Sequence, residues 1–130
     1  MKKSMEGGIK VNENKIFEIP LNLPSLKDYT KVYKTNKILA NKMLYDIEQQ
    51  IKNSLKEMPN WSKHIKIYFT WVKNKNKNLD VGFAKKIILD TMVKCGKLNE
   101  DNRNSVYSFI DSFTYNFGGE NKVILEVEED

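Results

Sequence analysis

Acidic side chains lie at both ends of an apolar run within the segment 78–101, where they could hold a divalent cation beside a phosphate. Asp80 lies where the polar stretch NKNLD gives way to an apolar run, and Glu100 and Asp101 follow that run. Metal-dependent cleavage of a phosphodiester uses carboxylates from different elements, because hard cations prefer oxygen ligands and keep positions open for water and phosphate. The two ends of this run are a helix length apart, so their convergence depends on how the second loop folds back.

Asp80 has a simpler interpretation as a helix N-cap. An aspartate there accepts free backbone N–H groups, and its charge suits the positive end of the helix dipole. From spacing alone, a helix cap at Asp80 and a solvated loop at Glu100 and Asp101 are favoured over a metal site. A cap would accept Asn at nearly equal stability, so Asp80→Asn is expected to cost little stability if capping is the only role, and to abolish metal binding if it is a ligand.

Positive charge is concentrated in one part of the chain. The sequence has 22 Lys and Arg against 17 Asp and Glu, and the stretch from Lys63 to Lys86 holds seven lysines and a single acid, Asp80. A basic field of this kind suits a polyanion such as nucleic acid, while a lysine-rich composition explains part of the total. The lysines expected to contact phosphates are Lys73, Lys75, Lys77 and Lys85, with Lys27, Lys31 and Lys34 from the loop before the first helix.

Length and composition indicate one domain spanning residues 1–130, with residues 1–14 as a flexible or loosely attached N-terminus. The single Cys95 cannot form an internal disulfide and is expected to be a buried structural thiol. The only histidine, His64, is expected on the surface, and Trp61 and Trp71 in the core or a dimer contact. The sequence shows neither a signal-peptide pattern nor a transmembrane stretch, which predicts a cytoplasmic protein with no membrane partner.

Hydrophobic spacing predicts six elements in the order β-α-β-α-β-β. This order indicates an α/β fold, a small mixed sheet with two main helices packed on it. The GGEN turn is expected to join the last two strands as an antiparallel hairpin. The elements are a strand closed by Pro20, a helix between Lys34 and Met58, a strand over HIKIYFTWV, a helix from about Asp80 to Lys94 with Gly96 as its C-cap, and strands over SVYSFIDSFTYNF and KVILEVE.

Four stretches of the chain are similar, in order, to the RusA-type family of phage-encoded Holliday-junction resolvases. They are IPLNLPSLKDYTKVYKTNK, IKIYFTW, NLDVGFAKKIILDTMVKCGKLNEDN and VYSFIDSFTYNF…KVILEVE, and they run from about Ile19 to Glu128. The family typically reads Asp-x-Asp-Asn, a short spacer, one or two lysines, Ile-Leu-Asp-Ala-Leu, Ala-Gly-Val-Leu and a second acidic pair. This chain has NLDV, KK, ILDTM, CGKL and NED at the corresponding places.

The resemblance implies a homodimeric endodeoxyribonuclease that resolves four-way DNA junctions by paired nicks during recombination and repair, with Mg²⁺, or Mn²⁺ in its place, as cofactor. On the matching positions, Asp80 and Asp101 take the metal-binding aspartates. Lys86 or Lys85 takes the catalytic lysine. Asp90 takes the aspartate of the Leu-Asp segment, a partner of that lysine.

Two positions depart from the family motif. Asn78 stands where the first aspartate is expected and Val81 where the asparagine is expected, and an alternative alignment puts Asp80 on the asparagine. An amide oxygen can ligate a hard cation but brings no charge, so metal affinity is expected to be weaker. The alternative function is therefore a catalytically weakened or inactive junction-binding protein. For the dimer contact, Leu89 and Val93 are the candidates, because they fall outside the main apolar arc of their helix.

Overall fold

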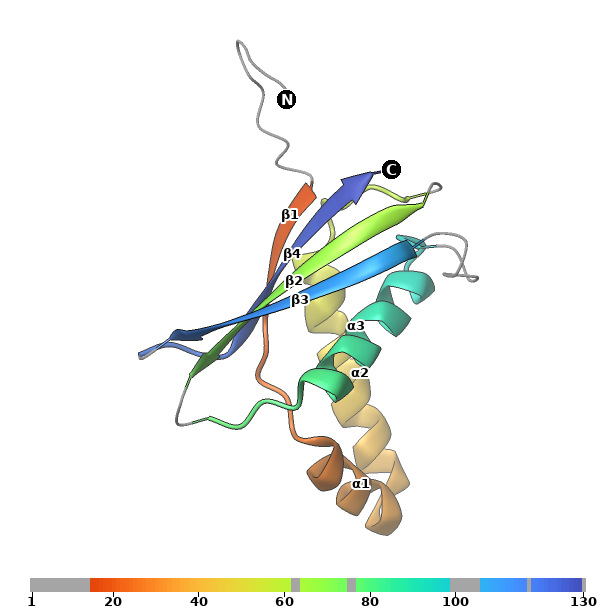
Figure 1. Ribbon diagram of the computed structural model, residues 1–130. Coiled ribbons are helices and arrows are strands. Elements are labelled where there is room, and N and C mark those ends of the chain that lie inside the picture. Colours follow the sequence, from red (N-terminus) through yellow and green to blue (C-terminus); the bar gives the residue numbers. More distant parts are fainter. Residues whose placement is uncertain (1–14, 62–63, 75–76, 99–105, 117, 130) are drawn as a thin grey trace.

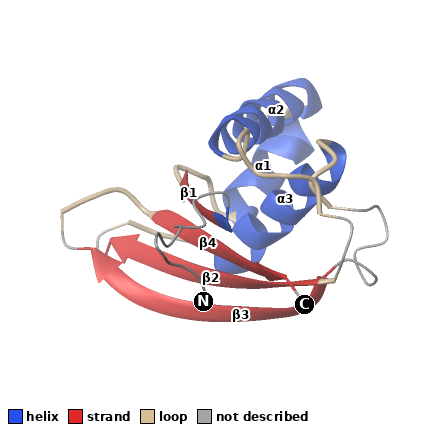
Figure 2. Cartoon of the chain, turned by 90° about the horizontal axis from the view of Figure 1, so that it is seen from above, coloured by secondary structure: helices blue, strands red, loops and turns tan. Residues whose placement is uncertain are grey.

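The computed structural model describes residues 15–61, 64–74, 77–98, 106–116 and 118–129, and the three helices lie on one side of a four-stranded mixed sheet (Figures 1 and 2). The predicted α/β class and mixed sheet are confirmed. The predicted positions that lie outside the described residues are 1–14, Lys63, Lys75, Glu100 and Asp101. The elements are β1 Ile16–Pro20, α1 Leu26–Thr35, α2 Lys37–Ser54, β2 Ile65–Asn74, α3 Val81–Lys94, β3 Val106–Asn116 and β4 Lys122–Glu129.

The sheet order is β1-β4-β2-β3, so the predicted hairpin between the last two strands is wrong. β4 pairs antiparallel with both β1 and β2, whereas β3 pairs parallel with β2 on its other side. The apolar side chains of β4, among them Val123 and Leu125, are fully buried, which suits a central strand. The strands β2 and β3 are joined through α3, the helical crossover that a parallel pair needs.

The core lies between the sheet and the helices. Alternate residues of β2 point into it, as predicted, and Phe69 and Trp71 are completely buried with their rings stacked at 5.5 Å. Full burial of a large apolar side chain contributes roughly 1.5–3 kcal/mol, so this row makes β2 the best-anchored strand. Trp61 is also buried and His64 is exposed, which confirms both predictions.

The second predicted helix matches α3 closely. Asp80 is its N-cap, and Gly96 follows it with a φ of 79°, a left-handed conformation that favours glycine at a helix end. The buried face includes Ala84 and Ile88. Cys95 is only partly buried, so the prediction of a buried thiol is wrong, because Cys95 is the C-cap of the helix and lies between the exposed residues Lys94 and Gly96.

Helix α1 is an element that the hydrophobic spacing does not predict, and the expectation that its lysines lie in a loop is wrong. Ser25 caps this helix, and its Oγ accepts a hydrogen bond from the backbone N–H of Asp28 at 3.1 Å. The pattern Ser-x-x-acid just before a helix is a capping signal that the sequence does contain. Lys27, Lys31 and Lys34 are therefore exposed helical residues, spaced along one side of α1.

Candidate functional site

Asp80 lies at the corner where the chain leaves β2 and enters α3. Its Oδ1 accepts a hydrogen bond from the backbone N–H of Phe83 at 3.1 Å, and its Oδ2 accepts one from the backbone N–H of Leu26 at 3.2 Å. The first donor belongs to α3 and the second to α1, 54 residues earlier in the chain. One carboxylate therefore caps one helix and ties the start of another to it.

This arrangement gives Asp80 a structural role that spacing could not reveal. Two helix N-termini meet at its carboxylate, and each carries a partial positive charge. That field stabilises the carboxylate and opposes a cation at the same place. Two of the four lone-pair positions of the carboxylate remain available after the two backbone hydrogen bonds.

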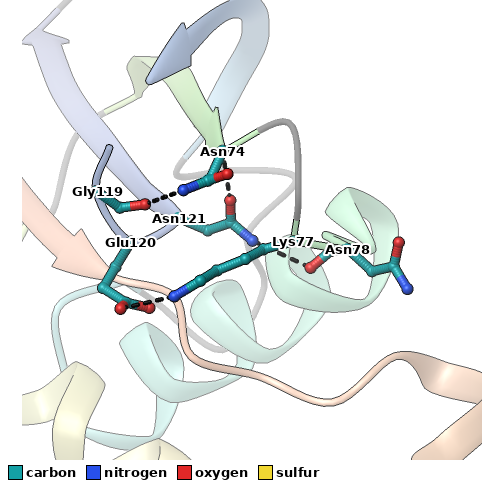
Figure 3. Close-up of polar contacts among 6 residues, drawn as sticks. All are labelled: Asn74, Lys77, Asn78, Gly119, Glu120 and Asn121. Atoms are coloured by element: carbon teal, nitrogen blue, oxygen red, sulfur yellow. Dashed lines mark hydrogen bonds and ion pairs between the residues drawn. The ribbon is translucent and has the colours of Figure 1, made fainter. Parts of the chain in front are cut away.

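The loop that leads to Asp80 is held by Asn121, whose side chain is only 3% exposed (Figure 3). Its Oδ1 accepts from the backbone N–H of Asn74 at 2.7 Å, and its Nδ2 donates to the backbone carbonyl of Asn78 at 3.0 Å. Its own carbonyl accepts from the backbone N–H of Leu21 at 2.8 Å. Asn121 thus joins the ends of β1 and β2 to the segment that carries Asp80.

Two further contacts complete this cluster. The Asn74 side chain donates to the carbonyl of Gly119 at 2.6 Å, and Lys77 Nζ lies 2.7 Å from Glu120 Oε2. The Asn78 side chain points away from Asn121 (Figure 3), so only its backbone takes part in the contact with Asn121. Sequence reasoning missed Asn121, because a single Asn in a GGEN turn looks like an ordinary turn residue.

The two adjacent lysines of α3 have different surroundings. Lys85 Nζ lies 3.0 Å from Asp111 Oδ2, and 5.0 and 4.7 Å from the ring centroids of Phe69 and Phe109. Lys86 Nζ lies 3.0 Å from Asp90 Oδ2, and its side chain is 74% exposed, against 23% for Lys85. The predicted approach of Lys86 and Asp90 is confirmed. Lys85 is fixed beside the sheet, and Lys86 is in solvent.

Asp111 is a second site residue that sequence reasoning missed. Trp71 Nε1 donates to its Oδ1 at 2.9 Å, and Lys85 contacts its other oxygen. Burial raises the pKa of Asp111. The hydrogen bonds from Trp71 and Lys85, together with the lysine charge, lower the pKa by more than burial raises it, so the pKa lies below its ordinary value of 3.8. Alternation along SVYSFIDSFTYNF was the available signal, since it puts Asp111 on the same face as Phe109.

The described residues do not by themselves make a magnesium site. Within this part of the chain, no three His, Cys, Asp or Glu side chains are close enough to share a metal ion. Asp80 is the one predicted metal ligand that the structure places, because Asp101 lies outside the described residues. Asp90 is bound to Lys86 on the exposed side of α3 and does not contact Asp80.

The predicted phosphate-binding lysines lie on separate elements. Lys73 is half-buried near the end of β2, Lys77 is paired with Glu120, and Lys85 with Asp111. The lysines of α1 lie on a helix that extends away from the sheet (Figure 1). The seven-lysine stretch is therefore partly neutralised within the fold, and α1 presents the more exposed basic surface.

An apolar groove of about 430 Å³ lies between the three helices. Tyr29 and Phe83 contact each other in its lining, with ring centroids 5.5 Å apart. The Lys94–Glu48 ion pair, at 2.6 Å, lies at its margin together with the Lys86–Asp90 pair. Its mainly apolar lining suits an apolar group and not a phosphate.

Comparisons with known proteins add no relative to this description. No family model matches the chain, and no curated protein sequence matches it. In the part of the chain that the structure describes, no helix is long and apolar enough to cross a membrane. The similarity to RusA-type resolvases therefore rests on the sequence motifs alone.

Proposed function

We propose that the protein is a RusA-type endodeoxyribonuclease that resolves four-way DNA junctions as a homodimer and depends on Mg²⁺. The observation that carries the proposal is the placement of the motif residues on the β2-α3-β3 unit. Asp80 ends the loop after β2, and the two lysines follow it on the early turns of α3. A carboxylate and an ammonium group on one helix end can address the same phosphate.

In this proposal Asp80 and Asp101 are the metal ligands. Mg²⁺ would lower the pKa of a bound water and stabilise charge on the phosphate. The donor set among the described residues is one carboxylate and the amide of Asn78, which is incomplete for a hard cation. The residues of this chain that can be assigned further are the lysines.

Lys86 is the better candidate for the catalytic lysine. Its ion pair with Asp90 is exposed, and such pairs are worth about 0.5 kcal/mol or less, so a phosphate oxygen can replace the carboxylate at little cost. Lys85 is held by Asp111 and two aromatic rings, and leaving them would strand a partly buried carboxylate. Lys85 then positions the helix against the sheet, and Lys86 contacts the DNA.

The proposed DNA surface is the lysine side of α1 with Lys73 and Lys77 near the end of β2, and the predicted Lys75 lies outside the described residues. Contacts between lysines and phosphates are electrostatic and read no bases. Affinity for DNA is expected to fall steeply with salt, because each neutralised phosphate releases counterions. Binding would then depend on the shape of the junction and not on its sequence.

A second function, junction binding without cleavage, is favoured by one specific observation. Both oxygens of Asp80 accept backbone N–H groups, so the carboxylate has a sufficient role as a double cap. Asn78 in place of the family's first aspartate points the same way, since it removes a charged ligand. The basic surface is common to both functions.

The test is incubation of the purified protein with labelled synthetic four-way junctions, with linear duplex and EDTA as controls. Paired nicks near the crossover that need Mg²⁺ would establish the nuclease. Binding without nicks would establish the second function, and no preference for junctions would reject both. Lys86→Ala is expected to slow cleavage about 100-fold while binding persists. Lys42→Ala is the matched control, because Lys42 also forms an exposed i,i+4 pair, with Asp46 at 3.2 Å.

A further inference from the structure

The outer edge of β3 is a long strand with exposed aromatic side chains. β3 has 11 residues, and β2 is its one partner in the sheet that the structure describes. Phe113 is 64% exposed and Tyr115 is 62% exposed, although their β2 partners are Trp71, completely buried, and Lys73. Figure 2 shows β3 at the outer edge of the sheet, farther from the helices than β2. The apolar surface under the helices thus continues onto an open edge.

This edge lacks the usual features that prevent strands from associating. Exposed edge strands are commonly protected by lysines, prolines or short length. The opposite edge, β1, has five residues, among them Glu18 and Pro20. β3 carries one charged residue, Asp111, and its charge is paired within the chain with Lys85. The charges along β3 therefore do not prevent pairing with a second strand.

A second copy of the chain can occupy this edge in a closed, symmetric arrangement. Two identical edges pair in a closed way only when they run antiparallel about a two-fold axis. With the axis at Ser112, Phe109 lies opposite Tyr115 of the partner subunit. An axis at Asp111 would instead set two carboxylates opposite each other, which destabilises a strand pair. Of these two registers, the one centred on Ser112 is therefore favoured.

We propose that two copies pair through β3 in the register centred on Ser112, which joins their sheets into one. This interface rests on the homodimer of the proposed function and gives that dimer its contact surface. The contact moves away from Leu89 and Val93, which pack against the core of their own chain. Both helical layers lie on the same side of the joined sheet. Phe109 and Tyr115 of the two copies lie opposite each other, and Phe113 lies opposite Asp111 of the partner subunit.

The first test replaces an exposed apolar residue on β3. Wild-type protein should sediment at twice the 15.2 kDa chain mass at high micromolar concentration. Phe113→Glu should raise the dimer Kd about 30-fold, because it removes a central aromatic contact and sets a carboxylate opposite Asp111 of the partner subunit. Ile38→Glu is the matched control, since Ile38 is 84% exposed on α2, and it should leave the Kd unchanged. Circular dichroism establishes that both variants are folded.

The second test reads the register without relying on Phe113. In a Cys95→Ser background, Ser112→Cys should form a disulfide-linked dimer on oxidation, because directly opposite residues of an antiparallel pair have Cα atoms about 4.5–5.5 Å apart. Thr114→Cys is the control on the same face. Its two copies would be offset by four residues, roughly 14 Å along the strand, too far for a disulfide.

The outcomes of these tests distinguish the proposed interface from the proposed nuclease activity. A wild-type protein that stays monomeric, a dimer that survives Phe113→Glu, or cross-linking at Thr114→Cys in place of Ser112→Cys would each overturn the interface. A dimer with the expected cross-link that cleaves no junction would support the interface and reject the nuclease. Cleavage by a protein whose dimer survives Phe113→Glu would reject the interface alone.

Discussion

Replacing Asp80 by Asn tests the double cap directly. The side chain keeps its shape, but an amide has one acceptor oxygen where the carboxylate has two. One of the two backbone donors, Phe83 N–H or Leu26 N–H, would then face an NH₂ group. Losing that hydrogen bond costs about 1 kcal/mol or somewhat more. Losing the charge at two helix N-termini adds about 0.3–1 kcal/mol for each helix.

The expected destabilisation is therefore about 2–3 kcal/mol, or roughly 10 °C in Tm for a chain of this size. This revises the expectation from sequence that Asn would replace Asp80 at little cost, which considered one helix end and not two. Thermal unfolding followed by circular dichroism measures the difference. Asp90→Asn is the control, because it also removes a carboxylate from α3 but breaks only the exposed pair with Lys86. A Tm loss for Asp80→Asn no larger than for Asp90→Asn would refute the double cap.

Three other predictions concern stability and DNA binding. Asn121→Ala leaves the Asn74 N–H and the Asn78 carbonyl without this partner, and it should lower the free energy of unfolding by about 2–4 kcal/mol in urea titrations. Because the pKa of Asp111 is lowered on folding, its carboxylate stabilises the folded state at pH values above 3.8, the ordinary pKa, and this stabilisation is lost as the pH falls through the lowered pKa. The Tm difference between wild type and Asp111→Asn should therefore shrink in acid. A difference that stays constant would contradict this. Charge reversal of Lys27, Lys31 and Lys34 on α1 should weaken junction binding more than 10-fold and reduce the salt slope by about 3 in anisotropy titrations. The same change at three control lysines, Lys42 and Lys52 on α2 and Lys56 just after it, should not.

Local patterns in the sequence predicted the elements with the clearest periodicity. The strand around Phe69 alternates strictly, and the helix after Asp80 has both a cap and a terminal glycine, so both were found at nearly their observed ends. Helix α1 was missed because its apolar residues are few, and no residue on it is buried. Ser25 and Asp28 are the local capping signal that the sequence contains for this helix.

Pairing between distant segments could not be predicted in the same way. The hairpin prediction for the last two strands followed from their adjacency in the chain, and nothing local shows that β2 lies between them. The contact of Asp80 with Leu26, and that of Asp111 with Trp71, join residues 54 and 40 positions apart. Such contacts depend on how the layers pack, so the candidate site was predicted by residue type but not by geometry.

The central place of β4 has a consequence for how the chain folds as it is synthesised. The unit β2-α3-β3 spans about 50 residues and can pair as soon as it leaves the ribosome. β1 must wait for β4, because Ile16 pairs with Glu126, more than 100 positions later. Until then the inner edge of β2 is open, and a nascent chain can aggregate through it. Completion of the sheet is therefore the last event of folding, and loss of β4 alone would leave both β1 and one side of β2 unpaired.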